Sequence, residues 1–188
     1  MVKVKLFATL LFWLFLLVGC NDPLPRPTKK GKDTFGCKIN GKRWIPEGGV
    51  LSNLKPLVAR YDGNILRIQA NTANKKANTT ISLYLEKVSG TGEYPINFTT
   101  NVPPFGTSYT SHGIYDHVDK TYLDPVSKIY GKHSFYATNA KYPGKVKITR
   151  LDASTKIVSG TFEFTAEEFN TPGQTVKITS GRFDIHWH

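Results

Sequence analysis

Alternation of apolar and polar residues with a period of two most limits what this chain can fold into. From Phe35 onward no stretch of about 11 residues keeps apolar side chains at helical spacing. Short alternating runs recur instead, as in 81–85, where Ile81, Leu83 and Leu85 share one face. Because successive side chains of a strand point to opposite faces, these runs predict strands with one buried face.

Turn signals separate the alternating runs. They are Asn40-Gly41, Asp62-Gly63, the glycine-containing stretch 89–92, Pro143-Gly144 and Pro172-Gly173. Between them the chain holds about nine or ten short strands. We therefore predict an all-β domain, either an antiparallel β-sandwich or a partly open barrel, with little or no helix.

Two local patterns make this prediction more specific. Asn40-Gly41 joins two alternating runs, which predicts an opening hairpin with Trp44 as a core anchor. In the last run the apolar residues are even-numbered before Ser180 and odd-numbered after Gly181. One extra residue in the strand would produce this change of parity, so we predict a β-bulge at Ser180-Gly181.

The N-terminus has the features of a secretory signal. Two lysines and no acid precede an apolar run at 6–18, which is too short to cross a hydrocarbon core of about 30 Å comfortably. The run ends in Leu17-Val18-Gly19-Cys20, which resembles the bacterial lipobox, in which the cysteine is acylated and becomes the first residue of the mature chain. We therefore predict a lipoprotein signal peptide at 1–19 and lipidation of Cys20.

The remaining chain divides into a tether and a single domain. Residues 20–34 contain three prolines together with Lys29, Lys30 and Lys32, which predicts an extended tether whose lysines face anionic lipid head groups or solvent. Residues 35–188 form the β-domain. The formal net charge of +11 for the full chain falls to +9 without the signal peptide. In the domain alone it is +7, from 19 Lys+Arg against 12 Asp+Glu.

The two cysteines are not expected to pair. Lipidation of Cys20 leaves Cys37 without an intramolecular partner, although an even count of cysteines often indicates a disulfide. We therefore predict that Cys37 is a small buried hydrophobic residue.

Several segments carry a family resemblance. They are Thr34-Phe-Gly-Cys-Lys-Ile-Asn-Gly-Lys-Arg-Trp, a central Gly-x-Tyr, Ile148-Thr-Arg-Leu-Asp, Val158-Ser-Gly-Thr-Phe-Glu-Phe and Ile178-Thr-Ser-Gly-Arg-Phe-Asp. Together they resemble a group of Bacteroidota outer-membrane lipoproteins whose domain is one of unknown function. The resemblance implies a secreted, lipid-anchored, all-β domain in the envelope of a Gram-negative bacterium. It implies no catalytic residues, because the family has no assigned activity.

The resemblance also bears on location and partners. In such bacteria an acid-rich stretch after the lipidated cysteine tends to mark export to the cell surface, whereas here Asp22 is followed by basic residues. We therefore expect the periplasm-facing leaflet of the outer membrane. The basic charge is dispersed, without the aromatic-interleaved stripe of single-strand binding proteins, so nucleic acid is not a predicted partner.

Seven of the nine tyrosines lie between Glu93 and Tyr142. Tyrosine has a flat apolar face and a hydrogen-bonding tip, which suits binding of sugars or partner proteins. An ordinary strand role is the alternative, since tyrosine favours strands. The binding residues that we predict in this region are Tyr109, Tyr115, Tyr122, His112 and His117.

Motifs for catalysis, metals and cofactors are weak. The chain has no Gly-x-Ser-x-Gly and no phosphate-binding glycine motif, and Cys37 has no histidine nearby in sequence. His186 and His188 would share a strand face, and Asp116, His117, Asp119 and Asp124 form a mixed cluster, but structural roles explain both better. We predict no metal site, no cofactor and no catalytic residue.

These observations favour a lipid-anchored envelope protein whose β-domain binds a ligand or partner, with a glycan as one candidate, and which is not an enzyme. Two alternatives stay open. One is a carbohydrate-active hydrolase that uses two carboxylates. The candidate carboxylates are Glu163, Glu167 and Glu168, although these residues are most simply interpreted as solvent-facing. The other is a structural subunit of an envelope complex, for which an exposed apolar patch would be the sign.

Overall fold

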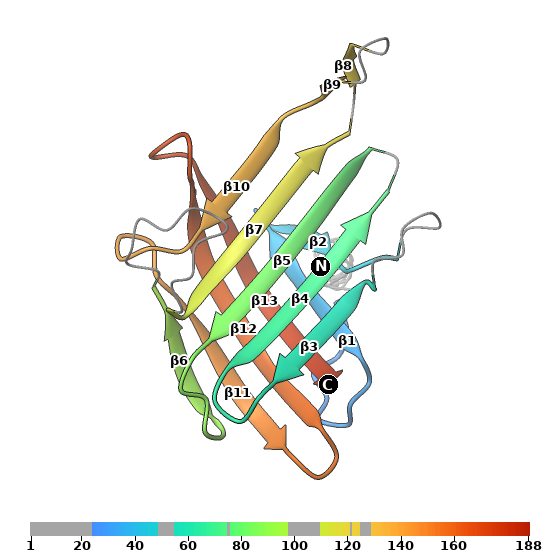
Figure 1. The fold of residues 1–188 in the computed structure, drawn as a ribbon, viewed down its shortest axis with the longest axis vertical. Helices are drawn as coiled ribbons and strands as arrows, with labels where there is room; N and C mark the ends of the chain where they lie inside the picture. Colours follow the sequence, from blue (N-terminus) through green and yellow to red (C-terminus); the bar gives the residue numbers. More distant parts are fainter. Residues whose placement is uncertain (1–23, 49–54, 75, 98–109, 121, 125–128) are drawn as a thin grey trace, which may run out of the picture.

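The computed structural model describes residues 24–48, 55–74, 76–97, 110–120, 122–124 and 129–188 (Figure 1). Within these ranges the chain forms thirteen strands and no helix, so the all-β prediction is confirmed. In chain order the strands are β1 (Thr34–Ile39), β2 (Lys42–Trp44), β3 (Leu57–Tyr61), β4 (Leu66–Ala73), β5 (Ala77–Leu85), β6 (Gly92–Ile96), β7 (His112–Asp119), β8 (Tyr122–Asp124), β9 (Ile129–Tyr130), β10 (His133–Ala137), β11 (Gly144–Asp152), β12 (Ile157–Glu168) and β13 (Thr175–His186). No helix in this described part has the length and hydropathy needed to cross a bilayer.

Eleven of these strands belong to one antiparallel sheet that curls back on itself. Its order is β2-β1-β13-β12-β10-β7-β5-β4-β3, while β11 pairs with β12 and carries β6. The sheet branches at β12, because residues 157–164 pair with β11 whereas Glu167 and Glu168 pair with β10. The remaining two strands, β8 and β9, pair with each other.

Figure 1 shows two layers whose strands cross. We call β3, β4, β5, β7 and β10 the front layer, and β1, β2, β6, β11, β12 and β13 the back layer. The layers are joined where β10 pairs with β12. Of the two predicted architectures the sheet is therefore the partly open barrel. The strands outnumber the nine or ten expected in part because β8 and β9 have only two or three residues each, too few to show alternation.

The core lies between the two layers and follows the alternation in the sequence. Phe162 is at its centre, with ring centroids 5.0 Å from Phe35 and 6.4 Å from both Phe164 and Phe183. Other inward side chains are Leu66, Ile68, Ile81, Leu83, Val146, Ile148, Ile178 and Ile185. Cys37 also lies here, fully buried and unpaired as predicted, and burial raises the pKa of its thiol to about 12.

The predicted hairpin and bulge are both present. β1 and β2 are joined by Asn40-Gly41, and the Trp44 ring packs edge-on against the core ring of Phe35. In β13 an extra residue interrupts the register at Ser180-Gly181, where Ser180 has a φ of 53°. A Cβ on Gly181 would lie 2.5 Å from a backbone carbonyl oxygen of β12, so this close approach requires glycine.

Candidate functional site

Residues 24–33, which we call the strap, lie across the outer face of the back layer. The group that makes most hydrogen bonds to the strap is the carboxylate of Asp184 on β13. Asp184 accepts hydrogen bonds from the Thr28 hydroxyl, from the backbone N–H groups of Lys30 (3.0 Å), Gly31 (2.9 Å) and Lys32 (3.2 Å), and from the Ser159 hydroxyl (2.7 Å). A carboxylate that accepts several N–H and O–H bonds forms strong, charge-assisted contacts.

Asp184 is buried because the strap covers it. Its strand neighbours Phe183 and Ile185 point into the core, so the Asp184 side chain points outward, yet it is only 1% exposed. Burial raises the pKa of a carboxyl group, but the hydrogen bonds from Thr28, Ser159 and the strap backbone outweigh this effect and lower the pKa of Asp184 to about 2. The charged carboxylate therefore stabilises the docked strap at neutral pH.

The backbone of the strap at Gly31 fits only glycine. Gly31 has a φ of +64°, and a Cβ there would lie 2.5 Å from the His186 ring. The next contact along the chain is between Asp33 and His186: the Asp33 carboxylate accepts the His186 backbone N–H at 2.8 Å and lies 3.1 Å from the ring nitrogen Nδ1. His186 therefore has a structural role in holding the strap against β13.

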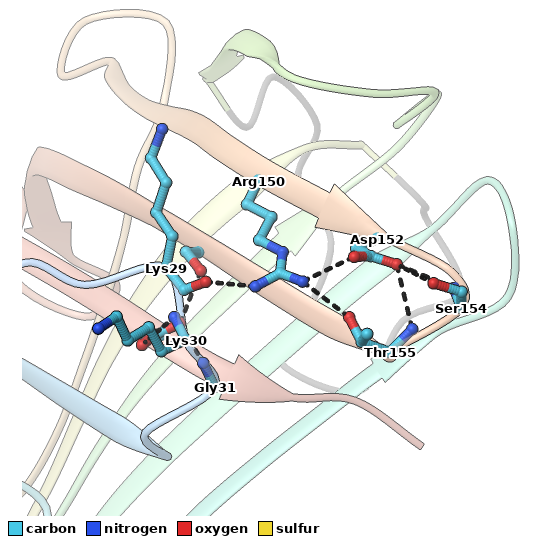
Figure 2. A network of polar contacts seen from close by, with 9 residues as sticks. Lys29, Lys30, Gly31, Arg150, Asp152, Ser154 and Thr155 are labelled. Atoms are coloured by element: carbon cyan, nitrogen blue, oxygen red, sulfur yellow. Dashed lines mark hydrogen bonds and ion pairs between the residues drawn. The ribbon is translucent and has the colours of Figure 1, made fainter.

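Arg150 of β11 holds the strap at its far side. Figure 2 shows the Arg150 guanidinium donating to the Lys29 carbonyl and, on its other side, to Asp152 and Thr155. Arg150 first, and then Ser154 and Thr155, hold the pKa of the Asp152 carboxyl well below its usual range. The amino ends of Lys29 and Lys30 point away from this network.

The beginning of the strap packs against β1 and β13. Leu24 is 5% exposed. A Cβ on Gly36 would lie 2.8 Å from Pro25 and 3.2 Å from Leu24. Arg182 donates to the Pro25 carbonyl at 3.1 Å. The proline-rich segment is thus fixed to the domain from Leu24 onward.

A second group of polar side chains faces the interior, at the junction of the two layers. Tyr115 and His117 of β7, Ser134 and Tyr136 of β10, and Glu168 of β12 share the inward parity of their strands, and we call them the inner polar cluster. Tyr115 is the register partner of Tyr136, which in turn is the partner of Glu168, and Ser134 is the partner of His117. The pairing of β7, β10 and β12 therefore brings all five side chains together.

Contacts between aromatic rings hold Tyr115 against its neighbours in the inner polar cluster. The Tyr115 ring lies 5.6 Å from the Tyr136 ring and stacks on His117 at 6.2 Å with an interplanar angle of 6°. His117 Nδ1 is 2.9 Å from the Thr79 hydroxyl. Burial raises the pKa of the Tyr115 hydroxyl, and the neighbouring Tyr136 raises it further. The hydroxyl of Tyr115 therefore stays protonated at neutral pH and can donate a hydrogen bond.

Glu168 has an incomplete set of hydrogen bonds. Its side chain is 2% exposed, and its oxygen Oε2 has no hydrogen-bond partner among the described residues. A buried carboxylate oxygen without a partner costs free energy and is uncommon in native proteins. A donor from outside the described chain, such as a ligand hydroxyl, would satisfy it.

The structure unites two of the five predicted binding residues, Tyr115 and His117. His112 lies on the opposite face of β7, where its ring stacks on Tyr84 at 5.1 Å and burial lowers its pKa. Tyr122 lies in β8, and its side chain is outside the described part. Tyr109 lies outside the described residues, as does the predicted lipidation site Cys20.

Strand parity separates the members of the mixed Asp/His cluster that the sequence analysis considered and set aside. Asp116 faces outward, where its carboxylate is 2.7 Å from His133, whereas His117 faces inward. Within the described ranges no three His, Cys, Asp or Glu side chains are placed to share a metal ion.

The three glutamates of β12 also separate. Glu163 is an outward residue whose carboxylate lies 3.6 Å from Lys145, and Glu167 accepts from Asn139 at 2.8 Å. Glu163 and Glu167 are about 13 Å apart along the strand, more than a glycosidase pair requires. The expectation of simple solvent exposure was wrong for Glu168, because its parity continues that of Phe162 and Phe164.

Of the two carboxylates that matter most, sequence reasoning placed Glu168 in solvent and did not single out Asp184. Glu168 could have been found by extending the even parity of β12 by one more step. Asp184 carried no such signal, since an acid between Phe183 and Ile185 looks like an ordinary outward residue of a strand. Its partners are at least 25 residues away in sequence.

Fold and site together define an all-β, half-barrel domain with a docked N-terminal strap and a polar cluster inside. The chain matches the family described as a domain of unknown function, DUF6252, over residues 55–184, and it belongs to this family. The match runs from just before β3 to Asp184 and does not include the strap. Searches of the curated proteins and of the solved structures found no match.

Proposed function

We propose that this protein is a lipoprotein of the bacterial cell envelope, related to the Bacteroidota lipoproteins that it resembles. In this proposal Cys20 is lipidated and the domain faces the periplasm from the outer membrane. The lipobox-like Leu17-Val18-Gly19-Cys20 carries the proposal. It gains support from the strap, because a chain that is fixed to the domain from Leu24 onward would couple the lipid closely to the fold.

Replacing Cys20 with serine tests the anchor. We expect the Cys20→Ser protein to move from the membrane fraction to the soluble fraction, because the acyl chains supply most of the affinity for the bilayer. Cell fractionation with immunodetection measures this, and Cys37→Ser is the matched control, since Cys37 is buried and should have no effect on fractionation. An unchanged membrane fraction for Cys20→Ser would contradict the anchor.

We infer that the domain is a binding module and that the inner polar cluster is its ligand site. Glu168 offers an unpartnered acceptor, and Tyr115 and Tyr136 offer aromatic faces beside it. Hydroxyl groups and flat apolar faces are what a sugar ring presents, so the cluster suits a glycan. The single observation that carries this inference is the unsatisfied oxygen of Glu168.

A glycan array of bacterial envelope saccharides tests the binding proposal. We expect Glu168→Gln to weaken the binding of any glycan that the wild type captures by at least about tenfold, because an amide NH2 group replaces one of the two carboxyl oxygens. Glu163→Gln on the outer face is the matched control and should bind as the wild type does. Equal binding by wild type, Glu168→Gln and Tyr115→Phe would remove the inner polar cluster as the site.

The two alternative functions gain no specific support. The glutamates of β12 do not form a pair at glycosidase spacing, as described above. Among the described residues Phe169 is the one large apolar side chain that is exposed, at 52%, and a single ring is not a contiguous docking patch.

A further inference from the structure

A shallow hollow of about 470 Å³ lies on the outer face of the back layer, beside the strap. Pro27 of the strap and Glu93 of β6 both line it. Three basic residues, Lys145, Lys147 and Arg182, line it together with a second acid, Glu163. Lys145 lies 3.6 Å from the carboxylates of both Glu93 and Glu163, so its charge is compensated locally. The hollow therefore keeps a small excess of positive charge, from Lys147 and Arg182.

Charge is distributed unequally between the two layers. The strap and the back-layer strands hold twelve Lys and Arg against seven Asp and Glu, whereas the front-layer strands hold two against two. Two of the seven acids do not reach the outer surface, because Asp184 is covered by the strap and Glu168 faces the interior. Counted over the strap and the strands, the back layer is consequently the more positive of the two layers.

The chain length before the strap limits how far this surface can lie from a lipid on Cys20. Four peptide units separate Cys20 from Leu24, and an extended chain spans at most about 3.6 Å per residue, or roughly 14 Å here. This upper limit exceeds the Debye length of about 8 Å at physiological ionic strength, beyond which exposed charges are largely screened. The surface therefore interacts with the charges of the membrane where the connecting residues span less than their full length and bring it to within about 8 Å of them.

We propose that the strap and the adjoining hollow form a membrane-facing surface that binds the phosphate groups of an anionic lipid bilayer. The proposal rests on the proposed lipidation of Cys20, and it adds an orientation: the back layer faces the bilayer and the front layer faces away from it. Lys29, Lys30 and Lys147 are the contact residues, since all three are exposed. The amino ends of Lys29 and Lys30 also point away from the network that fixes the strap backbone (Figure 2).

Binding to vesicles by the full chain carrying Cys20→Ser isolates this surface from the lipid anchor. We expect the protein to sediment with phosphatidylcholine vesicles that contain phosphatidylglycerol, not with phosphatidylcholine alone, and less as salt increases. Adding Lys29→Gln, Lys30→Gln and Lys147→Gln together should weaken binding roughly a hundredfold. The matched control removes three cations near the front layer: Lys55→Gln, Arg60→Gln and Lys76→Gln.

The results separate this proposal from the anchor. Equal loss in both triple variants, or no binding to anionic vesicles, would overturn the surface while leaving lipidation of Cys20 intact. Binding to a soluble acidic polysaccharide without binding to the vesicles would overturn the lipid as the occupant. Loss of membrane association by the Cys20→Ser chain in cells, by contrast, concerns the anchor alone.

The orientation of the domain on the membrane is measured in the lipidated protein with a fluorescent label on an introduced cysteine. The label is selective because native Cys37 is buried and stays unlabelled. A label at Thr161→Cys, in the hollow, should be quenched by spin-labelled lipid head groups. A label at Gln69→Cys, exposed on the front layer, should not. Equal quenching at the two positions would contradict the orientation.

Discussion

Asp184→Asn is expected to release the strap while the β-sheet stays folded. The substitution replaces an anionic acceptor by a neutral amide, so the N–H groups of Lys30, Gly31 and Lys32 lose their charge-assisted partner. With a folded-state pKa of about 2 against about 3.8 for the free group, the charged form contributes about 2 kcal/mol to docking at neutral pH.

Limited proteolysis by trypsin measures this release. Cleavage after Lys29, Lys30 and Lys32 depends on the fraction of molecules with an open strap, so we expect it to accelerate by at least about tenfold in Asp184→Asn. Asp62→Asn is the control, since Asp62 accepts two backbone N–H groups in a turn that does not contact the strap. Equal cleavage rates in wild type and Asp184→Asn would show that Asp184 does not hold the strap.

The same carboxylate predicts a pH dependence. Because the pKa of Asp184 is lowered in the folded state, its contribution is present above about pH 4 and is lost as the pH falls toward about 2. Strap cleavage cannot be followed by trypsin at that pH, so the backbone amide NMR signals of Lys30, Gly31 and Lys32 replace it. As the pH falls from about 4 to about 2, these signals should move in the wild type toward their positions in Asp184→Asn, and signals that stay in place would contradict the prediction.

Phe162→Ala is expected to lower the free energy of unfolding by about 3–5 kcal/mol. The Phe162 ring is 3% exposed and contacts Phe35, Phe164 and Phe183, so its removal leaves a cavity where β1, β12 and β13 meet the core. Urea unfolding followed by tryptophan fluorescence measures the change. Phe169→Ala is the matched control on the same strand region, because Phe169 is 52% exposed and should alter stability by less than about 0.5 kcal/mol.

A loss below about 1 kcal/mol for Phe162→Ala would contradict the position of this ring at the centre of the core. Phe162→Leu provides a graded comparison, since it keeps most of the buried apolar surface. We expect its loss to lie between those of Phe169→Ala and Phe162→Ala.

The fold class could be predicted because a strand with one buried face produces a local pattern in the sequence, the alternation of apolar and polar residues. Alternation at 81–85 and 158–164 marks strands with one buried face, and the parity change at Ser180-Gly181 marks the bulge. The branch at β12 could not be predicted. It depends on which neighbour each half of one long strand pairs with, and that choice is made between segments far apart in the chain.

The candidate site was predictable only in part, for the same reason. Tyr115 and His117 have the same parity, so one strand places them on one face. Glu168 joins them only through the pairing of β7, β10 and β12. The docking of the strap could not be predicted at all. The strap sequence has no apolar periodicity, and its main partner, Asp184, is more than 150 residues away in the chain.

Hydrogen exchange at the backbone amides of Lys30, Gly31 and Lys32 tests most directly the central claim that the strap is docked on Asp184. We predict slow exchange at these amides in the wild type, and exchange near the rate of an unstructured chain in Asp184→Asn, with β12 and β13 protected in both. Fast exchange of the three amides in the wild type, with the sheet protected, would contradict a docked strap.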